Sequence, residues 1–256
     1  MPLVFFRAVV PNSGFRTGWP KTVRKPALEE FVLRLGGRRM EAVHRRAKYI
    51  LVPLDTGATL ILHLGMAGRL RLQPGSQPAH PLVHHVFFLD DGSELRFQDG
   101  RKFGKLWLAQ DAMEVLPALG PEPLGEGFTA EALARALAGR IAPVKALLLE
   151  QSVAAGMGNL YADESLYLAG IHPLRPAAGL SLQEIARLRD AIVEALTSAG
   201  AQYDRSRAES WPDPPLALET WTIPRQLAAP CLRCGGSIEG IRVRARSTYF
   251  CPGCQE

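Results

Sequence analysis

The 256-residue chain is 47% hydrophobic and 21% charged, which is typical of a folded globular protein with one large core or two modest ones. Its longest apolar runs, at 59–62 and 86–89, are too short to cross a bilayer, and no signal peptide is recognisable, so we expect neither a membrane protein nor a secreted one. Residues 1–48 carry 11 Lys and Arg against 3 Asp and Glu, which favours a polyanionic partner, although a solvated basic surface would show the same excess.

Residues 48–110 have the pattern of closely spaced antiparallel strands. Apolar runs flank Asp55-Thr56-Gly57, and two more flank Asp90-Asp91-Gly92; such tripeptides are typical of hairpin turns. A further strand is predicted at 105–109. This spacing predicts a β-sandwich or a barrel.

The pattern changes near residue 111, where helices replace strands. A linker rich in Pro and Gly is predicted at 119–128. The helix after it has Thr129 as its expected N-cap and Gly139 as its expected C-cap. A second helix is predicted to begin near Pro143.

The clearest helical pattern follows Ser181. Ser181 and Glu184 have the spacing of a capping box, and Gly200 is the predicted end of this helix. Residues 201–228 contain several prolines and show weak periodicity, so we predict a loop there.

The stretch AAGMGN at 154–159 interrupts the helical region with two glycines. Gly156 and Gly158 would let main-chain N–H groups face outward, and Asn159 at the start of the next helix could donate its amide hydrogens to the same anion. This pattern predicts a phosphate clamp. A plain αα-hairpin with a glycine turn is the alternative.

The four cysteines lie in the last 26 residues, as C-x2-C, sixteen residues and C-x2-C. This spacing predicts one structural Zn²⁺ held by four thiolates, with a redox pair or unligated thiols as the alternative. The predicted ligands are Cys231, Cys234, Cys251 and Cys254. Because no disulfide framework is indicated, we expect a reducing, cytoplasmic setting.

The segment between the cysteine pairs alternates like a hairpin and carries three arginines. Arg242, Arg244 and Arg246 would share one face if they lay on one strand. Guanidinium groups suit phosphate, so phosphate contact is the interpretation we favour over a solvated strand edge.

Several segments together resemble one known family. They are, in chain order, RRAKYILVPL, HLGMAGRL, GRKFG, VKALLLEQSVAAGMGNLYADESLYLAGIHPLRPA and the terminal C-x2-C…RSTYFC-x2-C. This series resembles the formamidopyrimidine-DNA glycosylase and endonuclease VIII family, and the formamidopyrimidine branch in particular. The resemblance implies an α+β fold with three domains: an N-terminal antiparallel β-sandwich (1–115), a helical helix-two-turn-helix domain (116–228) and a zinc finger (229–256).

The resemblance also implies roles for individual residues. Lys48 and Arg246 match residues that hold phosphates at the damaged nucleotide and assist its chemistry. Met66 matches the residue that fills the gap left by a flipped base, with Arg101 and Phe103 as its companions. Without the resemblance, core packing is the simpler interpretation of Met66 and Phe103. Asn159 and Lys145 match phosphate-binding positions, and Arg140, in the basic stretch just before Lys145, is a further expected DNA contact.

The N-terminus departs from the family pattern. Family members begin Pro-Glu-Leu-Pro-Glu after the initiator methionine, with the proline nitrogen as nucleophile and the glutamate as acid. Here Pro2 is followed by Leu3. Two hypotheses follow: either an upstream in-frame segment supplies the missing residues, or the chain is a diverged paralogue that binds DNA without cutting it. Residues 201–228 also lack the family's lesion-contacting runs.

The expected function is base-excision repair by a DNA glycosylase and AP lyase that acts on oxidised purines in double-stranded DNA. Family members act as monomers, so we expect a monomer that is cytoplasmic and associated with the nucleoid. The alternatives are a non-catalytic protein that binds damaged DNA and a zinc-ribbon adaptor that contacts protein.

Overall fold

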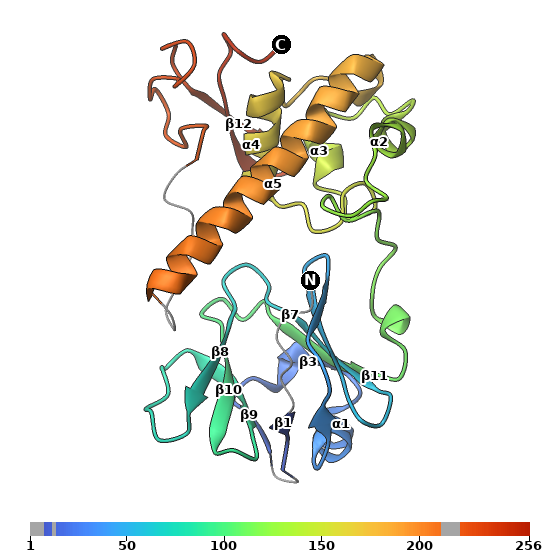
Figure 1. The fold of residues 1–256 in the computed structure, drawn as a ribbon, viewed down its shortest axis with the longest axis vertical. Helices are drawn as coiled ribbons and strands as arrows, with labels where there is room; N and C mark the ends of the chain where they lie inside the picture. The colour runs from blue at the N-terminus through green and yellow to red at the C-terminus, as the bar shows by residue number, and fades with distance from the viewer. Residues whose placement is uncertain (1–7, 12–13, 211–220) are drawn as a thin grey trace. The chain divides into compact units, whose positions relative to one another are not determined.

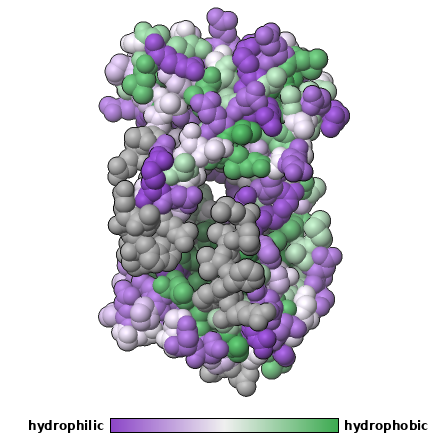
Figure 2. Space-filling model, viewed as in Figure 1, coloured by the Kyte–Doolittle hydropathy of each residue, from purple (hydrophilic) through white to green (hydrophobic). Residues whose placement is uncertain are grey.

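The computed structural model describes residues 8–11, 14–210 and 221–256 (Figure 1). The chain divides into two compact units, unit 1 (1–117) and unit 2 (118–256). Among the described residues, no helix has both the length and the apolar character needed to span a membrane. Hydrophilic residues are interspersed with smaller hydrophobic areas on the face drawn in Figure 2.

The described residues of unit 1 form two larger β-sheets, one α-helix and two 3-10 helices, η1 (Pro20–Thr22) and η2 (Ala112–Glu114). All pairings in these sheets are antiparallel except that of β3 with β11. The α-helix is α1 (Leu28–Leu35), and a short pair joins β1 (Ala8–Val9) to β4 (Arg39–Met40). The four-stranded sheet has the strand order β2 (Phe15–Thr17), β9 (Val83–Phe88), β10 (Ser93–Gln98) and β8 (Arg69–Pro74). The five-stranded sheet has the order β3 (Val23–Lys25), β11 (Lys105–Ala109), β7 (Thr59–His63), β6 (Tyr49–Pro53) and β5 (His44–Arg46).

The predicted hairpins of unit 1 are confirmed. Gly57 and Gly92 have φ values of 79° and 82°, the left-handed conformation that glycine adopts at little cost, and each lies in a turn between paired strands. The predicted strand at 105–109 is β11. Alternate residues of these strands enter one core, which includes Leu60, Leu62, Phe87, Phe97 and Leu106. The α1 residues Phe31 and Leu35 complete it.

The N-terminal capping residues of two helices in unit 2 are those predicted from the sequence. The Thr129 hydroxyl accepts a hydrogen bond from Ala132 N (3.1 Å) at the start of α2 (Ala130–Leu137). Ser181 and Glu184 make both hydrogen bonds of the capping box, at 2.8 and 3.2 Å. Gly139 lies one residue beyond the C-cap, at φ 69°. The remaining helical elements are α3 (Val144–Leu148), α4 (Asn159–Ala169), the 3-10 helix η3 (Ala177–Gly179) and α5 (Leu182–Ser210).

The prediction that Gly200 ends the last helix is wrong, because α5 continues to Ser210. A glycine inside a helix costs only about 1 kcal/mol relative to alanine, and packing can offset this. Ala199 is buried, and Gln202 lines a cavity beside Trp221. The expected loop at 201–228 is therefore helical over its first ten residues, and residues 211–220 lie outside the described part.

The C-terminal hairpin pairs β12 (Glu239–Val243) with β13 (Arg246–Phe250). Arg244 and Ala245 form its turn, with φ values of 47° and 60°. The expectation that the three arginines share one strand is therefore wrong. Arg242 is on β12, Arg244 is in the turn and Arg246 is on β13, because the chain reverses between Arg242 and Arg246. The helices and this hairpin form a single compact unit, and the three-domain division at 1–115, 116–228 and 229–256 stays a prediction.

Candidate nucleic-acid interface

In unit 1, Lys48 lies at the turn between β5 and β6. Ala47 precedes it at φ 52°, and the Ala47 carbonyl accepts a hydrogen bond from Arg45 Nη1 at 2.9 Å. The Lys48 side chain is exposed. Burial lowers the pKa of the nearby His63, and the positive charges of Lys105 and Lys48 lower it further. The sequence therefore places Lys48 on a tight turn at the surface, where an ammonium group can reach an anion.

Two loops of unit 1 carry the predicted gap-filling residues. Met66, between β7 and β8, is 56% exposed, and Phe103, between β10 and β11, is 50% exposed. The Arg101 guanidinium carbon lies 5.0 Å from the centroid of the Phe103 ring, a cation–π contact. Core packing is thus excluded for Met66 and Phe103, and large apolar side chains on exposed loops are suited to contact with unstacked bases.

The same two loops are packed against each other. Gly65 has a φ of 69°, and a Cβ atom there would lie 2.8 Å from the carbonyl carbon of Phe103. The Asp99 carboxylate accepts hydrogen bonds from the N–H groups of Arg101 (3.0 Å) and Gly104 (2.7 Å). Residue 65 therefore has to be glycine for this contact, and Asp99 fixes the shape of the loop that carries Arg101 and Phe103.

In unit 2, Asn159 is the first residue of α4, as the predicted turn implied. Its Nδ2 donates to the Ser247 carbonyl at 2.9 Å, which leaves its second amide hydrogen for another acceptor. Gly156 has a φ of 88°, but its N–H donates to Gln151 Oε1 at 3.0 Å instead of facing an anion. Gln151 Nε2 also donates to the Met157 carbonyl at 3.1 Å. Gln151, which the sequence did not indicate, therefore holds this turn in shape.

Lys145 is not at the surface. Its side chain has no exposed area, and its Nζ lies 2.5 Å from Asp163 Oδ1 and 2.5 Å from Thr248 Oγ1. Burial lowers the pKa of Lys145, while the Asp163 carboxylate raises it. Direct phosphate contact, which the resemblance implied for this residue, does not fit so buried a position.

Glu150 joins two arginines at the surface of unit 2. Its carboxylate lies 2.9 Å from Arg140 Nη2 and 2.5 Å from Arg244 Nη2. Burial acts in the opposite direction, but hydrogen bonds from Arg244 and Arg140 hold the pKa of Glu150 below its ordinary value. Arg246, at the start of β13, is exposed. The hairpin tip thus presents the guanidinium groups of Arg244 and Arg246, and the Glu150 carboxylate orients Arg244 together with Arg140.

The four cysteine sulfurs lie within 4.8 Å of one another, which fits one structural zinc ion. Four thiolates about 2.3 Å from Zn²⁺ would be about 3.8 Å apart. The Cys231–Cys254 and Cys234–Cys251 sulfur distances are 3.8 and 3.5 Å. The N–H groups of Arg233 and Gly236 point at Cys231 and Cys234 sulfur, each at 3.4 Å, and such donors stabilise thiolates.

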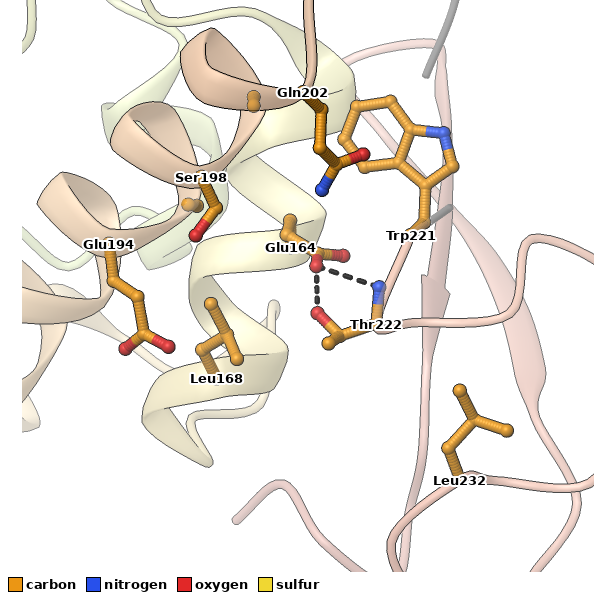
Figure 3. Close-up of a pocket in the computed structure, with 10 residues that line it drawn as sticks. Glu164, Leu168, Glu194, Ser198, Gln202, Trp221, Thr222 and Leu232 are labelled. Carbon is orange, nitrogen blue, oxygen red and sulfur yellow. Dashed lines mark hydrogen bonds between the residues drawn. The ribbon is translucent and has the colours of Figure 1, made fainter. Parts of the chain in front are cut away.

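A further polar group, Glu164, lies at a cavity of about 230 Å³ formed by α4, α5, residues 221–222 and Leu232 (Figure 3). The Glu164 carboxylate accepts hydrogen bonds from Thr222 N (2.8 Å), the Thr222 hydroxyl and Ile223 N (3.1 Å). Burial raises the pKa of Glu164, although these backbone donors lower it. The sequence analysis did not indicate Glu164, which lies beside a second buried acid, Asp163, in α4.

Comparison with known proteins covers almost the whole chain. Family models described as "Formamidopyrimidine-DNA glycosylase N-terminal domain", "Formamidopyrimidine-DNA glycosylase H2TH domain" and "Zinc finger found in FPG and IleRS" match residues 13–106, 119–208 and 229–256. Formamidopyrimidine-DNA glycosylase of Roseiflexus sp. (strain RS-1) is 43% identical over 246 residues, which cover 94% of this chain and 90% of that protein. The Geobacillus kaustophilus protein of the same name is 38% identical over 263 residues, covering 100% and 94%.

Solved structures agree with these relatives. The Lactococcus lactis enzyme in complex with abasic-site DNA has a TM-score of 0.87 at 30% identity and covers 97% of this chain and 93% of its own. A complex of the same enzyme with DNA that contains FAPY-dG has a TM-score of 0.85 at 31% identity, with the same coverage. The chain belongs to the formamidopyrimidine-DNA glycosylase family.

Proposed function

We propose that this chain is a DNA glycosylase and AP lyase of base-excision repair, which removes oxidised purines and nicks the abasic strand. The observation that carries this function is the match to glycosylases over more than nine-tenths of the chain, at 43% identity in one relative. The L. lactis structures contain FAPY-dG and abasic-site DNA, the substrate and the intermediate of such a reaction. The non-catalytic alternative is not favoured.

The exposed loops of unit 1 supply the groups that accompany base flipping. Extraction of a base from the stack costs a few kcal/mol, and apolar side chains that enter the gap offset part of it. Met66 and Phe103 are exposed for this role, and Arg101 lies beside Phe103 to contact the partner base. Lys48 contacts the phosphates of the damaged nucleotide.

Unit 2 supplies the contacts that hold the strand. Asn159 has one amide hydrogen available for a phosphate oxygen, and the exposed Arg246 guanidinium can bind a phosphate group through two parallel hydrogen bonds. Arg140 acts beside them, oriented by Glu150. The zinc ion acts on structure alone: bound by the four cysteines, it holds the hairpin that carries Arg246.

The reaction requires an amine that attacks C1′ of the damaged nucleotide and displaces the base. The resulting adduct becomes a Schiff base, from which the 3′ phosphate is eliminated. An α-amino group has a pKa near 8, so more of it is neutral at pH 7 than of a lysine amine. We do not assign this role to Pro2, because the residue after it is not the glutamate of the family pattern. Pro2 and Leu3, which stands where the family has its acid, both lie outside the described residues.

Borohydride trapping tests this function. The zinc-loaded product of the complete gene is incubated with duplexes that contain 8-oxoguanine or an abasic site, and a covalent adduct and a nicked strand are expected with each. Binding to the abasic duplex without adduct or nick would establish the non-catalytic alternative. We further propose that the protein acts as a monomer on damaged double-stranded DNA in the cytoplasm, associated with the nucleoid.

A further inference from the structure

A buried polar cluster lies behind the segments of unit 2 that carry Asn159 and Arg246. Lys145 of α3, Asp163 of α4 and Thr248 of β13 form this cluster, which we call the Lys145 cluster. The Lys145 and Asp163 side chains have no exposed area, and Thr248 is fully buried. Replacement of such a pair by apolar residues is often neutral or stabilising, so a buried ion pair is weak support for a purely stabilising role.

The ammonium group of Lys145 faces three oxygen atoms within unit 2. Its Nζ lies 2.5 Å from Asp163 Oδ1, 2.5 Å from Thr248 Oγ1 and 3.4 Å from the Ser247 carbonyl oxygen. Because the Lys145 side chain has no exposed area, its ammonium group does not reach a phosphate group at the surface.

These contacts lead to Arg246 by two short routes. The Thr248 hydroxyl, which accepts from Lys145, donates to the Arg246 carbonyl at 3.2 Å. The Ser247 carbonyl, on the residue next to Arg246, accepts from both Lys145 (3.4 Å) and Asn159 Nδ2 (2.9 Å). The backbone on the C-terminal side of Arg246 is thus tied to Lys145, and Asn159 is tied to the Ser247 carbonyl oxygen as well.

The opposite end of the Lys145 cluster is anchored as well. Arg225 Nη1 lies 2.9 Å from Asp163 Oδ2, and the Arg225 guanidinium carbon lies 5.0 Å from the centroid of the Tyr249 ring. One carboxylate therefore holds two cations, and residues 247–249 of β13 are bound to α3, to α4 and to residue 225. This arrangement limits movement of β13 relative to the start of α4.

We propose that Lys145 is a positioning residue, which sets the place of Arg246 relative to Asn159 so that both reach the same phosphate-bearing strand. It acts through Thr248 and the Ser247 carbonyl, with Asp163 fixing its own position. The proposal rests on the proposed function, because it requires that Asn159 and Arg246 bind DNA.

A double-mutant cycle tests it on the full-length, zinc-loaded protein, with a duplex containing an abasic-site analogue as the probe. Lys145→Met keeps the length of the side chain and leaves Asp163 paired with Arg225. We expect Lys145→Met to weaken binding about tenfold, as loss of hydrogen bonds to a charged group does. It should add little to Arg246→Ala, because residues that act through one another are not additive. Effects that multiply fully in the double variant would overturn the proposal.

Two further comparisons separate the positioning role from a general loss of charge or of folding. Lys25→Met removes an exposed lysine that pairs with Glu114 in unit 1, and binding should change by less than about twofold. Thr248→Val removes the hydroxyl, while Thr248→Ser retains it. We expect the valine variant to bind more weakly than the serine variant at equal zinc content. Equal affinity of these two overturns the proposal, even if Lys145→Met does not fold.

Failure of the two proposals can be told apart. If the wild-type protein neither binds the abasic duplex nor forms a trapped adduct, the proposed function fails. If the wild type binds and cuts, and Arg246→Ala weakens binding while Lys145→Met equals wild type, only the positioning role of Lys145 fails.

Discussion

The exposed ring of Phe103 permits a quantitative test of the base-contacting loops. An aromatic side chain buries about 150–250 Å² when fully covered, so at 50% exposure about 100 Å² of Phe103 remains for contact with DNA. At about 25 cal/mol per Å², this area corresponds to about 2.5 kcal/mol, or about 70-fold in affinity. We therefore expect Phe103→Ala to weaken binding of an abasic-site duplex by up to this factor and to slow base excision in single turnover.

The same substitution should have a small effect on folding. Loss of the Arg101 contact and of partial packing should lower the free energy of unfolding by about 1 kcal/mol or less. Leu33→Ala is the matched control, because Leu33 is a 77% exposed apolar residue on α1 of the same unit and not part of either loop. Anisotropy titration and urea unfolding measure both quantities. The reasoning is refuted if Phe103→Ala binds like wild type, or if it unfolds the protein as loss of a core residue would.

Three further predictions concern the metal, a buried histidine and Glu164. Removal of metal with a chelator should abolish hydrogen-exchange protection over residues 239–250 and DNA binding together, because the metal supplies on the order of 10 kcal/mol; protection that persists contradicts this. Burial lowers the pKa of His85 to about 4, so the unfolded chain binds more protons between about pH 6.5 and 4, and acidification through this window should cost up to about 3 kcal/mol of stability. His85→Gln should remove that difference in denaturation at pH 4.5 and 7, whereas His44→Gln, at an exposed position, should not. Glu164→Gln replaces one carboxylate oxygen by an NH₂ group that cannot accept from the N–H groups of Thr222 and Ile223. This change should lower the free energy of unfolding by about 1–3 kcal/mol, and an unchanged melting temperature would contradict a stabilising role of Glu164.

The pH dependence attributed to His85 follows from its contacts. Its Nε2 lies 2.7 Å from the Thr22 hydroxyl, which itself donates to the Trp19 carbonyl at 2.8 Å. Among the described residues, its Nδ1 has no hydrogen-bond partner. A proton at Nδ1 would therefore be buried without an acceptor, so protonation of His85 favours the unfolded chain.

Features that depend on a few neighbouring residues were predictable from the sequence. The turns at Gly57 and Gly92, the N-cap at Thr129 and the capping box at Ser181 are set by local backbone preferences and short-range hydrogen bonds. The cysteine spacing predicted the zinc site for the same reason, because each C-x2-C pair places two thiolates on one tight turn.

Other features required contacts between distant segments. Lys145 meets Thr248 across 103 residues, and Glu164 meets Thr222 across 58, so neither burial nor partner was visible in the local pattern. The extension of α5 past Gly200 likewise depends on packing in the region of Ala199, and not on the propensity of glycine. A charged residue in a motif indicates only that the site uses a charge. Whether that residue contacts the ligand, or holds another residue that contacts the ligand, depends on its burial and its ion-pair partners, which only the folded chain determines.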